Sequence, residues 1–128
     1  MNDQGVMFNK TWLYQGGNWY AFKSSGAMIS ADWLYDNGSW YYLKDSGSMA
    51  TGWLKNGSTW YYLNKSGSMV TGWVKDNGSW YYLRDSGSMA IGWVKDNGKW
   101  YYLASSGKML RNTYTPDGYY VDASGAWK

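Results

Sequence analysis

The chain of 128 residues contains no cysteine, no histidine and no glutamate, so its nine acidic side chains are all aspartates. Disulfides are therefore excluded, and the usual ligands of a zinc ion are missing. A Ser–His or Cys–His catalytic pair is impossible for the same reason. We expect a protein that needs no cofactor and no metal and that is not an enzyme, although a catalytic domain could exist elsewhere in a longer parent protein.

The residues that usually fill a protein core are scarce as well. The chain has only 2 phenylalanines and 1 proline, against 11 tryptophans, 14 tyrosines and 17 glycines. Cores are normally built from leucine, isoleucine and valine. In this chain the indole and phenol rings must therefore supply much of the packing.

Charge and hydropathy argue against two classes of partner. The formal net charge of +3 and the pI near 9.0 make the chain mildly basic. No run of lysine and arginine is dense enough to indicate nucleic-acid binding. No apolar stretch approaches the length of a membrane span, and no signal peptide opens the chain. We expect neither a nucleic-acid partner nor membrane insertion.

A repeat of 20 residues organises the whole sequence, with one extra residue between the first two units. Two tryptophans seven residues apart recur in phase, and so does a methionine. The pairs are Trp12/Trp19, Trp33/Trp40, Trp53/Trp60, Trp73/Trp80 and Trp93/Trp100, and the methionines are Met28, Met49, Met69, Met89 and Met109. We expect one repeat domain over 1–128, with units at 12–32, 33–52, 53–72, 73–92 and 93–113, a shortened last unit at 114–128, and the end of a preceding unit at 1–11.

Each unit has the pattern of a β-hairpin. Asn-Gly pairs lie between the two tryptophans at 37–38, 77–78 and 97–98. This dipeptide favours a type I′ turn, whose two central residues both need positive φ. Gly16-Gly17 serves the same end in the first unit. In the third unit Asn56-Gly57 is shifted by one residue while the tryptophan spacing is kept, so we expect a different turn type there.

The Asn77-Gly78 turn predicts the register of its hairpin. As a two-residue loop it pairs Asp76 with Ser79, Lys75 with Trp80, Val74 with Tyr81 and Trp73 with Tyr82. Because side chains alternate along a strand, Trp73, Trp80 and Tyr82 share one face, and Val74, Tyr81 and Leu83 share the other. A lone hairpin is marginal in water. We therefore expect an all-β repeat solenoid of stacked β-hairpins, each packed on its neighbours.

The tryptophan face indicates a ligand site. Core packing is the alternative, but the aliphatic face already suffices for a stack, and a buried indole N–H needs a partner. A third aromatic recurs in phase at Tyr42, Tyr62, Tyr82, Tyr102 and Tyr120. In the first unit this position is Ala21, and in the last unit Gly118 replaces the second tryptophan. Both changes lie at an end of the repeat, where no neighbouring hairpin would complete a pocket. Pockets between consecutive hairpins explain this pattern, and six units predict up to five of them.

Three electron-rich rings without a fixed carboxylate suit a quaternary ammonium ion. Ring faces attract the cation, and its methyl groups gain apolar contact, at about 0.5–2 kcal/mol for each cation–π contact. Immobilising the ligand offsets much of this sum, so we expect roughly millimolar affinity per pocket, about −4 kcal/mol. Several weak pockets on a polymer bearing many such groups would attach firmly through effective concentration.

The segment TGWVKDNGSWYYLRDSGSMA, residues 71–90, resembles the choline-binding repeat (cell-wall-binding type 1) of pneumococcal and streptococcal choline-binding surface proteins. The resemblance runs from about Trp12 to Trp127 and depends on the paired tryptophans, the WYY triplet and the SGxM segment. It implies a left-handed β-superhelix that holds choline between adjacent hairpins. It also implies attachment to phosphocholine on teichoic and lipoteichoic acids, an extracellular location at the bacterial cell wall, and homodimers that form through terminal hairpins.

Carried over by position, the resemblance implies five choline sites, each with two tryptophans, a tyrosine and a methionine or its substitute. They are Trp12, Trp19, Tyr42 and Met49; Trp33, Trp40, Tyr62 and Met69; Trp53, Trp60, Tyr82 and Met89; Trp73, Trp80, Tyr102 and Met109; and Trp93, Trp100, Tyr120 and Trp127. The methionines from Met28 to Met89 are the alternative for the first four sites, if the connector before the second hairpin lines each site.

Two other functions stay open. A glucan-binding repeat module has similar aromatic units, but sugar sites need amide and carboxylate groups, which here lie mostly in turns. A structural spacer would bind no ligand at all. A choline titration followed by tryptophan fluorescence separates these functions.

Two charged residues recur beside the turns, lysine at 55, 75 and 95 and aspartate at 36, 76 and 96. The lysines either meet the phosphate of phosphocholine or, as we favour, form a solvated face whose stems cover the neighbouring tryptophan rings. The aspartates are interpreted as turn residues.

Overall fold

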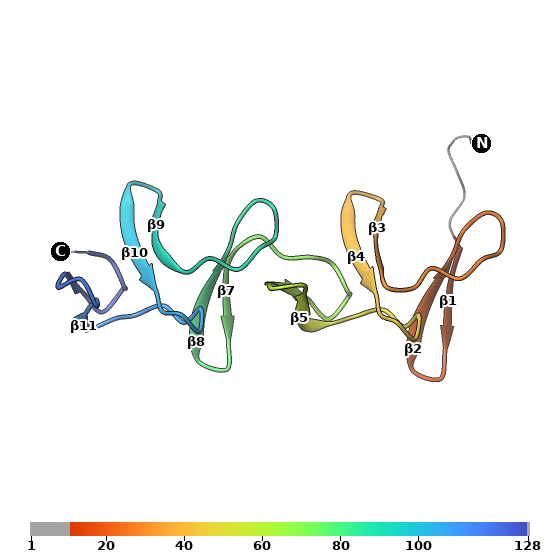
Figure 1. Cartoon of the computed structure of the whole chain (residues 1–128), viewed down its shortest axis with the longest axis horizontal. Helices are drawn as coiled ribbons and strands as arrows, with labels where there is room; N and C mark the ends of the chain where they lie inside the picture. The colour runs from red at the N-terminus through yellow and green to blue at the C-terminus, as the bar shows by residue number, and fades with distance from the viewer. Residues whose placement is uncertain (1–10, 128) are drawn as a thin grey trace. The chain divides into compact units, whose positions relative to one another are not determined.

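The computed structural model describes residues 11–127, an all-β chain of paired strands (Figure 1). The strands are β1 (Thr11–Gln15), β2 (Asn18–Phe22), β3 (Asp32–Asp36), β4 (Ser39–Leu43), β5 (Gly52–Asn56), β6 (Thr59–Leu63), β7 (Gly72–Asp76), β8 (Ser79–Leu83), β9 (Gly92–Asp96), β10 (Lys99–Leu103), β11 (Thr113–Tyr114) and β12 (Tyr120–Val121). Within the described residues they form six two-stranded sheets, each made of sequence neighbours. The predicted repeat of hairpins is confirmed. No helix in residues 11–127 has the length and apolar character that a membrane span requires.

The hairpin of β7 and β8 has the predicted register. Trp73 lies opposite Tyr82, and the remaining pairs follow as expected. The turn has φ of 52° at Asn77 and 86° at Gly78, as a type I′ turn requires.

The third turn differs from the others, also as predicted. Gly57, with φ of 67°, is the one residue of this turn whose φ is positive. A positive φ at the first central position alone is the pattern of a type II′ turn. The shift of the Asn-Gly pair by one residue thus changes the turn type while the hairpin is kept.

Buried aliphatic side chains that recur with the repeat form the core. The largest fully buried residues are Leu43, Leu63, Leu83, Leu103 and Val121, and each ends the second strand of its hairpin. One such residue recurs in each hairpin from β3–β4 onward, so each of these hairpins contributes its own part of the core.

From the second hairpin onward, each connector returns to the preceding hairpin through one backbone hydrogen bond. The N–H of Met109 donates to the carbonyl of Trp80 at 2.8 Å. The same bond joins Met49 to Trp19, Met69 to Trp40, Met89 to Trp60 and Trp127 to Trp100. Each bond places the methionine position of one repeat beside the second tryptophan of the repeat before it.

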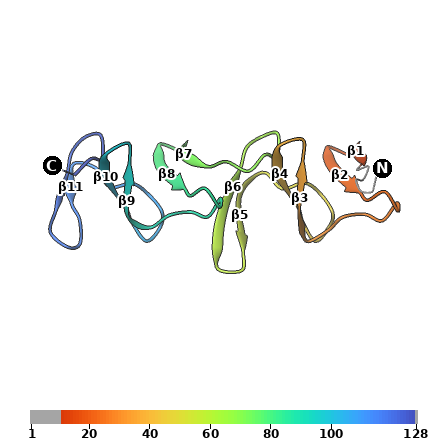
Figure 2. The ribbon, with the colours of Figure 1, turned by 90° about the horizontal axis from the view of Figure 1, so that it is seen from above.

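The contacts divide the chain into two compact units. The N-terminal unit holds the described residues up to Leu54 together with Leu63–Met69, and the C-terminal unit holds Lys55–Tyr62 and the residues from Val70 onward. Within each unit successive hairpins turn in different directions, as β1–β2 and β3–β4 show in Figure 1 and β7–β8 and β9–β10 show in Figure 2. The handed superhelix and the exact repeat boundaries stay predictions. Of the expected preceding unit, residues 1–10 lie outside the described residues.

Candidate ligand-binding cages

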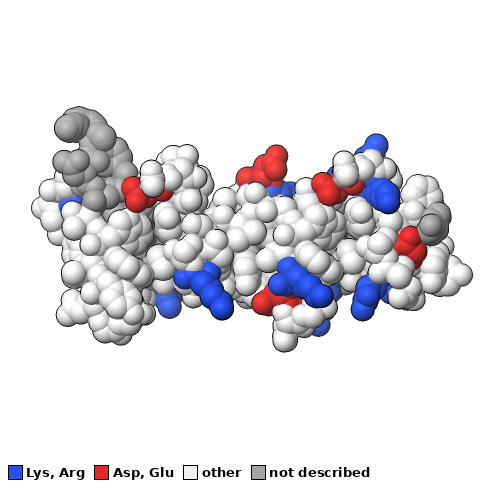
Figure 3. Space-filling view, turned by 180° about the vertical axis from the view of Figure 1, so that it is seen from behind, with Lys and Arg blue, Asp and Glu red and all other residues white. Residues whose placement is uncertain are grey.

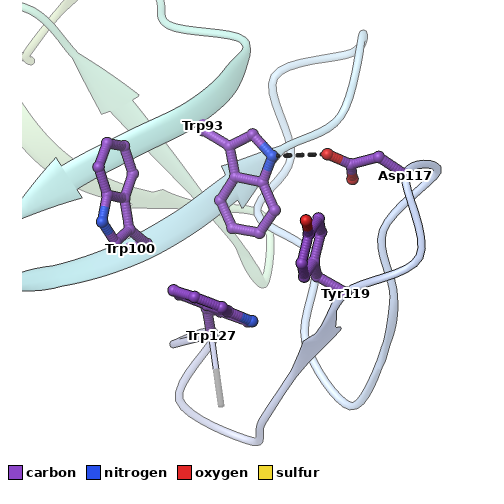
Figure 4. Close-up of a pocket in the computed structure, with 5 residues that line it drawn as sticks. All are labelled: Trp93, Trp100, Asp117, Tyr119 and Trp127. Atoms are coloured by element: carbon purple, nitrogen blue, oxygen red, sulfur yellow. Dashed lines mark hydrogen bonds between the residues drawn. The ribbon is translucent and has the colours of Figure 1, made fainter.

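An open cavity of about 370 Å³ in the C-terminal unit, here called the C-terminal cage, is lined by Trp93, Trp100, Asp117, Tyr119 and Trp127 (Figure 4). The rings of Trp93 and Trp100 come from β9 and β10 and meet at 86°, with centroids 6.4 Å apart. Tyr119 and Trp127 also meet at 86°, with centroids 5.6 Å apart. Rings set nearly perpendicular cannot stack on one another, so ring faces stay available to a ligand.

A carboxylate holds Trp93 in place. Its Nε1–H donates a hydrogen bond of 3.0 Å to Asp117 Oδ2 (Figure 4). The hydroxyl of Thr115 donates to the other oxygen of the same carboxylate. The Thr115 bond first, and the Trp93 bond second, lower the pKa of Asp117 below its ordinary value. Asp117 therefore stays charged and keeps the indole ring oriented.

The N-terminal unit contains a second cavity, of about 390 Å³, here called the N-terminal cage, lined by Trp12, Trp19, Tyr41, Met49, Lys65 and Ser66. The centroids of Trp12 and Trp19 lie 6.4 Å apart at 84°. Tyr41, from β4 of the next hairpin, lies 5.2 Å from Trp12 at 67°. One hairpin thus supplies two tryptophans, and the next repeat supplies the tyrosine and the methionine.

A third set of residues repeats this arrangement in the C-terminal unit. Trp73 and Trp80 lie 6.4 Å apart at 86°. Tyr101 from the next hairpin lies 5.0 Å from Trp73 at 73°, and Met109 is bonded to the backbone of Trp80. The same geometry therefore recurs with the repeat.

In the three sets that the structure brings together, the tyrosine beside the tryptophans is not the predicted one. The tyrosine predicted for the first set is Tyr42, but Tyr41 lines the N-terminal cage. Tyr42 contacts Trp33, its cross-strand partner in the same hairpin, with centroids 5.1 Å apart. Because side chains alternate along β4, Tyr42 shares a face with Trp33, whereas Tyr41 projects toward the preceding hairpin.

The same correction applies in the C-terminal unit. Tyr101 takes the place predicted for Tyr102, which lies 5.1 Å from Trp93 in its own hairpin. Tyr119 lines the C-terminal cage in place of Tyr120, which contacts Tyr114 at 5.1 Å.

Several other predicted site residues have defined surroundings. Met49 and Trp127 line their cages, as their assignment requires. Met28, the alternative methionine, lies against Gly47, where a Cβ would be only 2.7 Å from its Sδ. The predicted sets Trp33, Trp40, Tyr62, Met69 and Trp53, Trp60, Tyr82, Met89 draw on residues of both units, and their assembly stays a prediction.

The recurring aspartates do more than form turns. The indole Nε1–H of Trp12 donates to Asp36 Oδ2 at 3.0 Å, and that of Trp73 donates to Asp96 Oδ2 at 3.0 Å. Each aspartate belongs to the hairpin that follows its tryptophan. The interpretation as turn residues missed this role. The available signal was that an acceptor recurs in phase with an indole that needs one.

The recurring lysines cover tryptophan rings, as we favoured. The Nζ atoms of Lys55, Lys75 and Lys95 each lie 5.9 Å from the ring centroid of Trp60, Trp80 and Trp100 respectively. This distance is within the range of a cation–π contact. These ammonium groups therefore already have an aromatic neighbour in their own hairpin.

Comparison with known families assigns the repeat. A family model described as "Choline-binding repeat" matches residues 35–71 and 70–114, which is more than half of the chain. The chain belongs to the choline-binding repeat family. A second model, described as a putative cell wall binding repeat, matches residues 10–28. A comparison with curated proteins found no match.

Solved structures of choline-binding proteins are similar to the chain. Choline binding protein F from Streptococcus pneumoniae, in the presence of a peptidoglycan analogue, is 50% identical, with a TM-score of 0.84 over 91% of this chain and 39% of its own. The choline binding domain of another protein in Streptococcus pneumoniae is 49% identical, with a TM-score of 0.58 over 62% of this chain and 95% of its own. The pneumococcal cell wall endolysin from phage Cp-1, complexed with choline, is 44% identical, with a TM-score of 0.55 over 88% of this chain and 35% of its own. The chain spans less than half the length of protein F and of the endolysin.

Proposed function

We propose that this choline-binding repeat chain is a non-catalytic attachment module, which holds choline headgroups of teichoic and lipoteichoic acids in its cages at the bacterial cell wall. The observation that carries the proposal is the recurrence of two tryptophans and a tyrosine, set at steep angles, around the open cavities of both units. The family membership and the choline-bound relative support the same ligand.

The chemistry of the cages fits a trimethylammonium group. Its charge is spread over methyl groups, so it loses little hydration on entering an aromatic cavity and gains cation–π attraction from the ring faces. The described lining of the N-terminal cage contains no carboxylate. In the C-terminal cage the one carboxylate, Asp117, is already engaged by Trp93 and Thr115. Few polar groups are left for a sugar ligand, which argues against the glucan-binding alternative.

The charge distribution fits a carbohydrate–phosphate polymer better than a nucleic acid. On the face seen in Figure 3 the charged side chains stand in small separate groups on an uncharged surface. Without a dense basic patch the affinity has to come from the cages. Each cage binds weakly, at roughly millimolar affinity, and several cages on one polymer multiply that affinity through effective concentration.

A choline titration followed by tryptophan fluorescence tests the proposal. We expect a saturable change at roughly millimolar choline and no response to dextran. Trp100→Ala should weaken retention on a choline matrix, whereas Tyr114→Ala, which changes an exposed ring outside the cage, should not. A fluorescence response to dextran alone would favour glucan binding, and no response to either ligand would refute a binding role.

The homodimer implied by the family stays part of this proposal. Sedimentation of the chain with and without choline measures it directly. A single monomeric species under both conditions would contradict pairing.

A further inference from the structure

The two cages differ in the charged side chains that line them. An aspartate holds one tryptophan of each cage, Asp36 in the N-terminal cage and Asp117 in the C-terminal cage, but only Asp117 lines its cavity. Lys65 and Ser66 line the N-terminal cage beside its rings, whereas Asp117 lines the C-terminal cage. In the described residues no other charged side chain lines either cavity. Both sets of rings suit the same trimethylammonium group. The difference between the cages therefore concerns what is attached to that group.

Lys65 is particular to its cage. At the equivalent position of the SGxM segment the neighbouring units have Asp45, Asp85 and Ser105. The Lys65 side chain is exposed, and within residues 11–127 its ammonium group makes no ion pair or hydrogen bond. It is therefore free to pair with an anionic group of a ligand whose cation occupies the rings.

Asp117 gives the C-terminal cage a negative wall. Its carboxylate is oriented by the bonds from Trp93 and Thr115, so it cannot turn away from the cavity without losing them. A nearby phosphate would be repelled, and a cation without a phosphate would be attracted. Lys95, whose Nζ lies 5.9 Å from the Trp100 centroid, does not line the cavity.

We infer that the N-terminal cage prefers phosphocholine, because Lys65 pairs with its phosphate, whereas the C-terminal cage prefers choline itself because of Asp117. The inference rests on the proposed function, in which both cages hold a choline group. It assigns the two cages different parts in attachment. The N-terminal cage recognises the phosphate ester together with the choline group. Free choline displaces phosphocholine most easily from the C-terminal cage.

Site-resolved affinities test this inference on the full chain. The indole N–H signals in ¹H–¹⁵N NMR spectra report each cage separately once they are assigned with single Trp→Phe variants. Choline and phosphocholine are titrated in turn, and the ratio of their Kd values is taken at Trp19 and at Trp100. We expect the preference for phosphocholine to be about three-fold greater at Trp19, since exposed ion pairs are weak. At about 1 M salt, where the Debye length is roughly 3 Å, the difference should vanish.

Charge variants isolate the side chains. Lys65→Gln should remove the preference at Trp19, and Lys65→Glu should reverse it. Lys44→Gln is the matched control, because this exposed lysine of the same unit loses the same charge but does not line the cage. Asp117→Asn should raise the relative affinity of the C-terminal cage for phosphocholine.

Two results would overturn the inference while choline binding stands. They are equal Kd ratios at Trp19 and Trp100, or a preference at Trp19 that survives Lys65→Gln. If no indole signal responds to either ligand, the proposed function itself fails and the inference with it.

Discussion

Gly67 and Gly26 occupy the same position of their repeats, with φ of 89° and 91°. Among residues 11–127, a Cβ added at Gly26 would meet no atom within 4 Å, whereas at Gly67 it would lie 2.3 Å from Met49 Sδ. Alanine at either position is strained by the positive φ, at about 1–2 kcal/mol. Gly67→Ala alone must also displace the side chain of Met49, which lines the N-terminal cage.

The size of the additional effect follows from the flexibility of methionine. Met49 has three rotatable bonds, and a shift of about 30° from a preferred rotamer costs about 0.5–1.5 kcal/mol. We expect Gly67→Ala to reduce the free energy of unfolding by about 1 kcal/mol more than Gly26→Ala does. The displaced thioether would lose about 0.5–1 kcal/mol of contact with the cage, so the choline affinity at Trp19 should fall about two- to five-fold.

Urea denaturation measures the first effect, and NMR titration of choline at the Trp19 indole measures the second. Gly26→Ala is the matched control and should leave the affinity unchanged. In the double variant Met49→Ala/Gly67→Ala no side chain overlaps the new methyl group. The double variant should therefore lose about 1 kcal/mol less stability than the two single variants lose together. Equal effects of Gly67→Ala and Gly26→Ala on both quantities would refute the close packing of Met49 on Gly67.

Three further predictions concern the rings and the carboxylates that hold them. Tyr41→Ala should weaken choline binding at the Trp19 indole signal several-fold, whereas Tyr42→Ala should mainly lower stability in urea, because only Tyr41 lines the cage. Asp96→Ala leaves the Trp73 indole N–H without its acceptor and should cost about 1 kcal/mol in urea denaturation, whereas Asp96→Asn, which can still accept, should cost less. The pKa of Asp117 is lower in the folded chain than its ordinary value, so its stabilising contribution is present above the unfolded pKa and is lost as pH falls through the folded one. Asp117→Asn should reduce that loss of stability in acid, measured as the urea midpoint against pH.

Each of these has a contrary outcome. Equal losses of affinity in Tyr41→Ala and Tyr42→Ala would show that both rings contribute to the cage. Equal stability of the two Asp96 variants would mean that the indole bond contributes nothing. The same pH profile in the wild-type chain and in Asp117→Asn would remove Asp117 from the acid response.

The hairpins were predictable because local chemistry decides them. The Asn77-Gly78 turn accepts positive φ at both residues, and a two-residue loop leaves one register. The changed turn at Gly57 followed from the same reasoning. These features depend on neighbours in sequence, and the residues alone carry that information.

The cages were predictable only in part, because they depend on how one hairpin meets the next. The tryptophan pairs and Met49 could be assigned from the period. Tyr42 was assigned where Tyr41 lies, although strand alternation already put Tyr42 on the face of its own Trp33. The same alternation leaves Tyr41 as the ring that can reach the preceding hairpin.

The contacts of the aspartates lay beyond the sequence pattern. Whether Asp36 reaches the indole of Trp12 depends on the distance between two hairpins, which no spacing rule gives. The place of Lys65 in the N-terminal cage was not predictable either. Its connector follows the third hairpin, whereas the tryptophans of the cage belong to the first. Long-range placement of polar groups is what the structure adds.

The backbone bond from each methionine position to the tryptophan of the preceding repeat has a genetic consequence. Main-chain atoms make this bond, so it does not depend on which side chains the two units carry. After an in-frame gain or loss of one repeat, the units on either side of the change can therefore form the same bond. Such a change does alter which charged residue, such as Lys65, lines the cage of a given tryptophan pair. Exchange of one repeat for another would thus change the ligand preference while the hairpins stay intact.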